Sequence, residues 1–174
     1  MLSRINIFSI IKDHFKTLRS LNQSYKFINF KDFLLFLLFP LIIASIVTYK
    51  GYSFKDQLGN LIAAVAIFGG FLFNLLAIIY GQIDKIQNDA EKEDDNLKKR
   101  FVKEIHINIS FCIVLSILIV ISLLLTTVDI PNFRGEIILE RMITGTVYFL
   151  LILFVLTLIM VLNRVYILLK KDSE

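Results

Sequence analysis

Charged residues are missing from four long stretches of this 174-residue chain. The charge-free stretches contain 17 positions between Asp32 and Lys50, 27 between Asp56 and Asp84, 24 between Glu104 and Asp129, and 22 between Arg141 and Arg164. A helix that crosses the bilayer core needs roughly 17–25 predominantly apolar residues. Four such stretches in so short a chain exclude a soluble enzyme domain, a secreted disulfide-rich domain and a disordered chain.

Cysteine and long polar segments are also scarce. The single cysteine, Cys112, has no partner for an internal disulfide, and its place in an apolar stretch predicts a small core residue. The longest charged segments, 1–32 and 84–104, are too short for a separate soluble domain, because modules below about 40 residues usually need a metal or disulfides. We therefore expect one domain, residues 1–174.

Signals for catalysis and for ion transport are absent. No carboxylate lies inside any apolar stretch, whereas pumps and cation channels usually carry one there. His14 and His106 are far apart in the sequence, and neither belongs to a metal-ligand pattern. The chain also has no P-loop, dinucleotide fingerprint or nucleophile elbow. We expect a protein that is not an enzyme and that needs no cofactor or metal.

The apolar stretches themselves predict an all-α polytopic membrane protein. Four transmembrane helices are expected, at residues 33–49, 58–80, 105–127 and 142–163. The first is short for the bilayer core, and Pro40 near its middle removes one backbone hydrogen bond and predicts a kink.

Two further helical segments are expected outside the membrane. Within the N-terminal segment 1–31, apolar residues share one face of a helix over 4–22, namely Ile5, Phe8, Ile11, Phe15, Leu18 and Leu21. This helix lies either in the plane of the interface beside anionic lipid or on the protein's own cytoplasmic surface. Residues 82–104, which join the second and third spans, predict a charged cytoplasmic helical hairpin with its turn near Asp94–Asn96.

The second span carries a stripe of small residues. Its members recur at three- and four-residue steps, with one amide beside them: Ala63, Ala66, Gly70, Asn74, Ala77 and Gly81. Small residues at this spacing let two helix backbones approach closely in lipid, and Asn74 can add a hydrogen bond between helices. The stripe predicts a helix–helix interface, formed either within the chain or between copies in a homo-oligomer.

Basic residues predict the orientation in the membrane. The N-terminal segment, the middle connection and the C-terminal tail hold 15 Lys and Arg residues, against 4 in the other two connections. The positive-inside rule then places both termini and the middle connection in the cytoplasm. The candidate residues for contact with lipid or a cytoplasmic protein partner are Arg4, Lys12, Lys16, Arg19, Lys98, Lys99, Arg100 and Lys103. Direct binding of nucleic acid is not expected.

The segment Leu61–Lys85, LIAAVAIFGGFLFNLLAIIYGQIDK, resembles small four-span bacterial membrane proteins of anti-phage defence systems, of the Kiwa membrane-subunit type. The resemblance implies a homo-oligomer in the inner membrane that detects infection. It also implies a cytoplasmic partner, encoded nearby, that acts on phage nucleic acid.

Two functions follow as hypotheses. The first is a non-enzymatic, oligomeric sensor or scaffold of a defence or stress system that recruits a cytoplasmic partner. The second is a pore-forming effector that depolarises the cell, since uncharged spans with scattered Ser, Thr and Asn can line a weakly selective path.

Overall fold

The computed structural model describes residues 6–18, 32, 34–88, 95–127 and 136–173. Every regular element among them is helical, which confirms the predicted all-α class for the described residues. The elements are α1 (Ile7–Thr17), the π-helical turn η2 (Leu34–Leu38), α3 (Phe39–Tyr49), the 3-10 turn η3 (Lys55–Gln57), α4 (Leu58–Asn88), α5 (Asp95–Leu125) and α6 (Glu136–Ser173).

Among the described residues, three helices are long and apolar enough to cross a membrane. They cover Leu58–Gly81, Lys99–Leu125 and Ile137–Ile167, which agree with the predicted second, third and fourth spans. The apolar helix Leu34–Tyr49 is shorter. At 1.5 Å per residue its 16 residues reach about 24 Å, less than a bilayer core of about 30 Å. The predicted first span is therefore present as an apolar helix, but its passage through the membrane remains a prediction.

The helices extend beyond the residues that are predicted to lie in the membrane. Helix α6 begins at Glu136, six residues before the expected Met142, and runs on to Ser173. Asp95 and Asn96, expected in a turn, already belong to α5. Charge limits how deeply a residue enters lipid, but it leaves the backbone hydrogen bonds of a helix intact.

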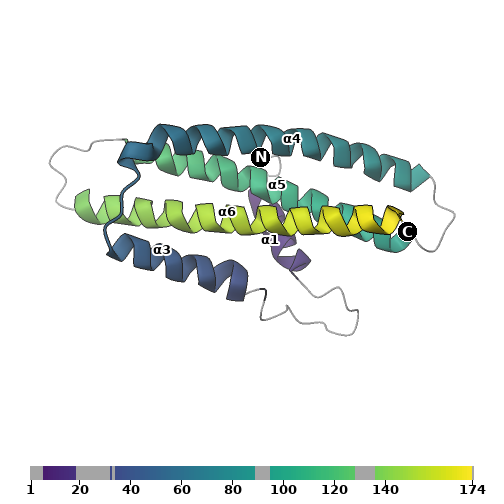
Figure 1. Ribbon diagram of the computed structural model, residues 1–174, viewed down its shortest axis with the longest axis horizontal. Coiled ribbons are helices and arrows are strands. Elements are labelled where there is room, and N and C mark those ends of the chain that lie inside the picture. The colour runs from purple at the N-terminus through teal and green to yellow at the C-terminus, as the bar shows by residue number, and fades with distance from the viewer. Residues whose placement is uncertain (1–5, 19–31, 33, 89–94, 128–135, 174) are drawn as a thin grey trace.

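The helices form a single row in the order α4, α5, α6, α3 (Figure 1). Helix α4 packs on α5, α5 on α6, and α6 on α3, whereas α3 does not contact α4. The row is therefore an open layer with α4 and α3 as its two edges. Helix α5 lies inside the row and carries most of the fully buried apolar side chains, including Ile105, Ile109, Cys112, Ile119 and Leu123. The predicted burial of Cys112 is thus confirmed.

The connection from α3 to α4 crosses one end of the row (Figure 1). It begins with a C-terminal cap at Gly51, whose φ of 73° favours glycine. The amides of Gly51 and Tyr52 donate to the carbonyls of Thr48 and Val47, which closes the last turn of α3. Farther along, the ring of Phe54 packs 4.1 Å from that of Tyr148 on α6 and anchors the crossing segment.

Pro40 lies where the helix changes type. The backbone is π-helical over Leu34–Leu38, directly before α3, and Pro40 occupies the first turn of α3 itself. Because proline lacks an amide hydrogen, a helix must open locally to accept it, and a wider π turn is one way to do so. The proline thus accompanies a change of helix type at the start of α3.

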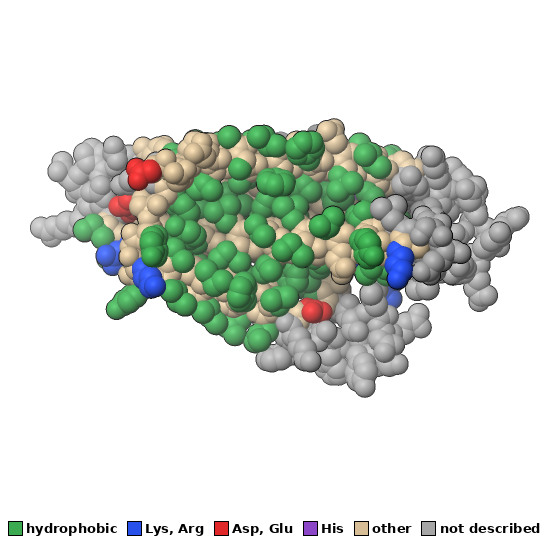
Figure 2. All heavy atoms as spheres, viewed as in Figure 1, with side chains coloured by type: hydrophobic (Ala, Val, Ile, Leu, Met, Phe, Trp, Pro, Cys, Tyr) green, Lys and Arg blue, Asp and Glu red, His purple; other side chains and the backbone are tan. Residues whose placement is uncertain are grey.

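Large apolar side chains cover the outside of the row. Figure 2 shows them across the middle of the visible face, with most of the visible charged side chains toward the two ends. On α4 alone, Ile67, Phe71, Phe73 and Ile78 are more than half exposed. A soluble protein rarely exposes so large an apolar surface, whereas lipid accommodates it without cost.

Candidate functional site

Helix α1 packs against the protein's own surface, as one of the two predictions for it stated. It crosses the row steeply and lies against α5 (Figure 1). The buried side chains at its centre are His14, Thr17 and Leu18. Phe8, expected on the same apolar face, is 84% exposed and points away from the row. The remaining predicted helix, before residue 6 and after residue 18, lies outside the described residues.

The start of α1 is fixed by a local cap. The side-chain oxygen of Asn6 accepts from the amide of Ser9 at 3.1 Å, and the Ser9 hydroxyl donates to the Asn6 carbonyl at 2.7 Å. The first of these bonds satisfies an amide that the first turn of a helix leaves unpaired. The helix therefore begins at a defined residue and presents His14 and Thr17 in register with α5.

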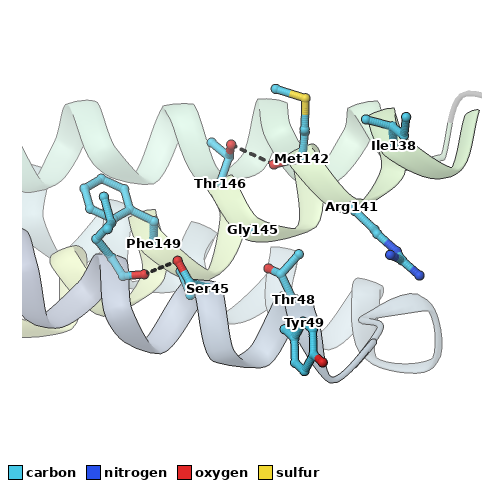
Figure 3. A pocket seen from close by; sticks show the side chains of 11 residues that line it. Ser45, Thr48, Tyr49, Ile138, Arg141, Met142, Gly145, Thr146 and Phe149 are labelled. Carbon is cyan, nitrogen blue, oxygen red and sulfur yellow. Dashed lines mark hydrogen bonds between the residues drawn. The ribbon is translucent and has the colours of Figure 1, made fainter. Parts of the chain in front are cut away.

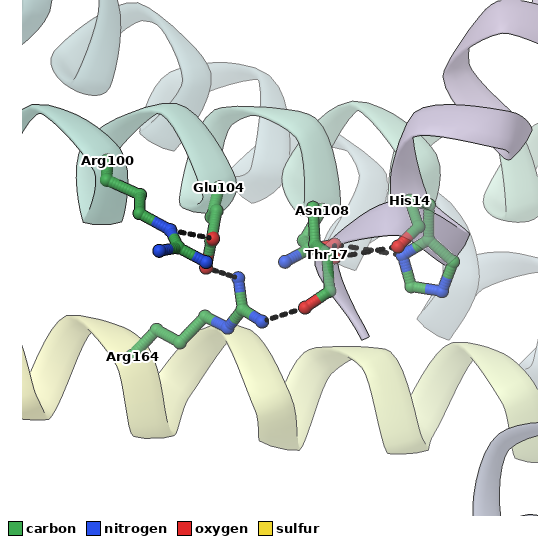
Figure 4. Close-up of polar contacts among 6 residues, drawn as sticks. All are labelled: His14, Thr17, Arg100, Glu104, Asn108 and Arg164. Atoms are coloured by element: carbon green, nitrogen blue, oxygen red, sulfur yellow. Dashed lines mark hydrogen bonds and ion pairs between the residues drawn. The ribbon is translucent and has the colours of Figure 1, made fainter. Parts of the chain in front are cut away.

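A network of six polar residues joins α1 to α5 and α6 (Figure 4). We call it the docking network, and it comprises His14, Thr17, Arg100, Glu104, Asn108 and Arg164. Its first half centres on Asn108, whose side-chain oxygen lies 2.9 Å from His14 Nδ1 and 2.9 Å from Thr17 Oγ1. The imidazole of His14 also stacks on Phe111, with ring centroids 3.8 Å apart. His14 and Thr17 of α1 are thereby held by α5, both through Asn108 and His14 also through Phe111 on the next turn.

The second half of the docking network centres on Arg164 of α6. One guanidinium nitrogen, Nη1, lies 2.6 Å from Glu104 Oε2, and the other, Nη2, donates to the backbone oxygen of Thr17 at 2.7 Å. That carbonyl ends α1, where a positive charge is favourable. Arg100 supplies a second, longer contact to Glu104, at 3.1 Å. Arg164 thus bridges α5, α6 and the C-terminus of α1.

Burial keeps His14 neutral. The ring is fully buried, and desolvation lowers its pKa from 6.5 to about 4, with a smaller contribution from the positive charge of Arg164. The hydrogen bond with Asn108 acts in the opposite direction. Within the described residues, His14 Nε2 and Asn108 Nδ2 have no hydrogen-bond partner although both are buried. A buried polar group without a hydrogen-bond partner costs roughly 1–3 kcal/mol. The contact between α1 and α5 therefore contains two hydrogen-bonding groups that are not satisfied.

The predicted small-residue stripe faces away from the rest of the chain. All six residues are exposed: Ala63, Ala66, Gly70, Asn74, Ala77 and Gly81. The residues of α4 that face α5 are Val65, Gly69, Leu72 and Ile79, and Gly69 is the glycine used for close packing. A Cβ built on Gly69 would lie 3.3 Å from Ser116 Oγ, whereas one on Gly70 would meet nothing within 4 Å. Within one chain the stripe therefore forms no helix–helix interface.

The predicted basic contact residues are divided among several environments. Lys12, Lys16 and Lys103 are exposed, and Lys16 pairs with Asp13 at 2.6 Å, which lowers the pKa of that carboxyl group. Lys99 is partly buried, and Arg100 belongs to the docking network. Arg4, Arg19 and the side chain of Lys98 lie outside what the structure describes.

The sequence analysis missed the docking network. Its signals are polar residues at positions where helical periodicity expects apolar ones, namely His14 in α1 and Asn108 near the start of the third charge-free stretch. Each is unremarkable alone, because nothing in the sequence shows that they meet. The hydrogen bonds of these six residues hold three helices together. No group of three or more His, Cys, Asp or Glu residues comes together among the described residues.

Comparison with known proteins adds no relative. No protein-family model, curated protein sequence or solved structure matches this chain.

Proposed function

We propose that this chain is a non-enzymatic scaffold or sensor of the bacterial cytoplasmic membrane that self-associates and recruits a cytoplasmic protein. The observation that carries the proposal is the exposed face of α4. The small-residue stripe lies on the side of α4 away from α5, and none of the other described helices lies against it. A second copy of the chain is the occupant that we propose for this face.

The shape of this face suits another helix. At 100° per residue the stripe members lie within about 40° of Gly70 around the helix axis. Large exposed side chains flank the stripe, with Phe73 and Tyr80 on one side and Ile67 and Ile78 on the other. The result is a shallow channel between two ridges, into which a partner helix can pack with close backbone contact.

Asn74 gives this face its polar contact. The amide is exposed on the stripe, and among the described residues it has no hydrogen-bond partner. A side-chain amide in hydrocarbon favours a partner across a helix interface, and such bonds contribute about 0.6–2 kcal/mol. Two copies that meet along the stripe bring their Asn74 amides within reach of each other.

The proposed topology has four spans and both termini in the cytoplasm. It is supported by the 15-to-4 distribution of basic residues and by the course of α3, which runs antiparallel to α4 along the opposite edge of the row (Figure 1). Three crossings alone would leave the two termini on opposite sides. In this orientation α1, the docking network, the end of α4 and the start of α5 lie on the cytoplasmic side.

The cytoplasmic partner would contact α1 and the α4–α5 hairpin. Phe8, Lys12 and Lys16 on the outer side of α1 are exposed, as is Lys103 on α5. Because α1 is held through Asn108, Arg164 and Glu104, movement of the spans would be transmitted to this surface. The resemblance of Leu61–Lys85 to defence proteins supports a role in anti-phage defence, in which the partner acts on phage nucleic acid.

The test uses two matched exposed positions of α4. Gly70→Leu places a bulky side chain in the centre of the stripe, where a Cβ built on Gly70 has no described atom within 4 Å. Ala64→Leu makes a similar change at an exposed position about 120° away around the helix. We expect the detergent-solubilised Gly70→Leu protein to lose the wild-type oligomer mass and Ala64→Leu to keep it. If Gly70→Leu retains that mass, the proposed interface is wrong.

The rival function, a pore that depolarises the cell, has less support. Several hydroxyls of the apolar helices donate to carbonyls of their own helix, as Ser45 does to Leu41, Thr146 to Met142 and Thr157 to Leu153. Donors engaged in this way are less available to line a water-filled path. Expression of the chain alone, followed with a membrane-potential dye, separates the two functions, because the scaffold leaves the potential unchanged.

A further inference from the structure

A groove runs along the other edge of the row, between α3 and α6. It has a volume of about 660 Å³, within the range of about 300–1,000 Å³ found for small-molecule sites. From α6 it is lined over Ile138–Phe149, and from α3 over Leu41–Tyr49. Eleven residue steps of helix correspond to about 16 Å, which is about half of a bilayer core of about 30 Å. The groove is thus as long as one leaflet is thick.

The groove exists because α3 and α6 meet closely at a glycine. A Cβ on Gly145 would lie 2.9 Å from Thr48 Oγ1, so the two backbones approach each other here more closely than side chains would allow. The hydroxyls of Ser45 and Thr146, which line the groove, each donate to a carbonyl of their own helix (Figure 3). Most of the surface offered to a ligand is therefore apolar, from Leu41, Met142 and Phe149.

The positive charge of the groove lies at one end. Arg141 is the one charged side chain among its lining residues, and it is exposed. Its guanidinium points away from Phe149 and extends beyond Thr48 (Figure 3). Tyr49, which is 92% exposed, lies toward the same end of the groove. Among the described residues Arg141 makes no ion pair. Glu140 does not line this groove, but it lines a smaller neighbouring hollow of about 240 Å³ that Arg141 lines as well.

We propose that this groove binds one anionic phospholipid. The phosphate pairs with Arg141 at the end where α6 begins, and one acyl chain lies along Met142 and Phe149 toward the middle of the bilayer. Arginine suits this role because its planar guanidinium donates two hydrogen bonds to one phosphate. A net negative headgroup is favoured over a zwitterionic one, because the groove presents a cation and no carboxylate. In the proposed topology this lipid belongs to the outer leaflet, although the site itself does not depend on that orientation.

The experiment compares Arg141→Gln with Lys50→Gln. Lys50 is an exposed basic residue at the same end of α3 that does not line the groove. The protein is purified in detergent, phosphatidylglycerol or phosphatidylcholine is added, and bound lipid is counted by native mass spectrometry. We expect one phosphatidylglycerol per chain for the wild type and for Lys50→Gln. For Arg141→Gln we expect about tenfold weaker binding, the loss expected when a hydrogen-bonded charge is removed.

A second variant tests the apolar part of the groove. Ser45→Phe fills it from an exposed position and should reduce binding of phosphatidylglycerol, with Arg141 still present. Glycerol phosphate, which carries the headgroup charge without acyl chains, should not compete. The proposal is wrong if Arg141→Gln binds phosphatidylglycerol as the wild type does, or if phosphatidylcholine binds equally well. It is also wrong if Ser45→Phe changes the oligomer mass and leaves lipid binding intact, since a second copy then covers the groove.

Discussion

The guanidinium of Arg164 on α6 lies 2.6 Å from the carboxylate of Glu104 on α5. Both side chains are about seven-eighths buried, with exposed fractions of 13% and 12%. The same guanidinium donates to the last carbonyl of α1, so one side chain determines how three helices meet. Removing it leaves a mostly buried carboxylate and an unpaired helix end.

Arg164→Gln is accordingly expected to destabilise the protein. A carboxylate that loses its partner in a mostly buried setting costs about 2–3 kcal/mol, even though Arg100 remains near Glu104. The matched control is Arg100→Gln, because Arg100 is 39% exposed and one helical turn away, and its loss should cost about 0.5 kcal/mol. Denaturant unfolding in mixed micelles measures both values. Equal losses for the two variants would show that Arg164 has no special role.

Acidification is expected to release α1. The pKa of His14 is about 4 when α1 is docked and 6.5 when the ring is solvated, so the undocked state binds more protons between these values. Docking is therefore strongest above pH 6.5 and weakens as the pH falls, by roughly 1.4 kcal/mol per pH unit. Between pH 7 and pH 5 the loss is about 2 kcal/mol. Amide hydrogen exchange across Ile7–Thr17 should accelerate accordingly relative to α5.

His14→Phe serves as the control for this pH dependence. Phenylalanine retains the stack on Phe111 and cannot be protonated, although it leaves Asn108 without its partner. We expect the variant to exchange faster than the wild type at pH 7, and its exchange rates, corrected for intrinsic chemistry, to change little from pH 7 to pH 5. A pH response as large as that of the wild type would assign the effect to another group.

The contact between Gly145 and Thr48 predicts a rescue. Gly145→Ala places a methyl group 2.9 Å from Thr48 Oγ1, and overpacking of this kind costs about 1–3 kcal/mol. Thr48→Ala removes the oxygen that would be struck, so the double variant should regain most of the stability lost by Gly145→Ala. Thermal unfolding in detergent of the four proteins in this cycle gives the coupling between the two sites. Additive losses would mean that the helices do not meet at this pair.

The adjacent glycines of α4 should respond differently to the same change. Gly69→Leu forces a side chain against Ser116 on α5 and should lower the stability of the single chain by about 1–3 kcal/mol. Gly70 is exposed and a Cβ built on it has no described atom within 4 Å, so Gly70→Leu should leave that stability nearly unchanged. Unfolding of the monomeric proteins in harsh detergent measures this difference. A comparable loss for both would place Gly70 in the interior of the chain.

The sequence predicted which segments are helical, but it did not predict which helices pack against each other. Lipid requires every backbone polar group to be paired within its own segment, so the charge-free stretches identify helices directly. Which helices touch depends on side-chain shapes that the apolar pattern does not record. The structure separates α3 from α4 by the width of two other helices, although only eight residues join Tyr49 to Leu58. Eight residues can cross that distance, because an extended chain spans about 3.3 Å per residue.

The docking network shows the same limit at the level of single residues. Periodicity placed Ile11 and Leu18 on the packed side of α1, but it also placed Phe8 there, and it gave no role to His14 and Thr17. Those two residues are buried because Asn108, 91 or more positions away, provides their hydrogen-bond partner. A partner so distant along the chain leaves no trace in the local pattern of either segment.

The two open edges of the row have different consequences for symmetry. A contact made by α4 of one copy on α4 of another uses the same patch twice, so it has a two-fold axis and ends at a dimer. A contact of α4 on α3 would instead be heterologous, and it would continue into a ring or a filament. A lipid bound between α3 and α6 would cover the second edge and so limit growth beyond the pair.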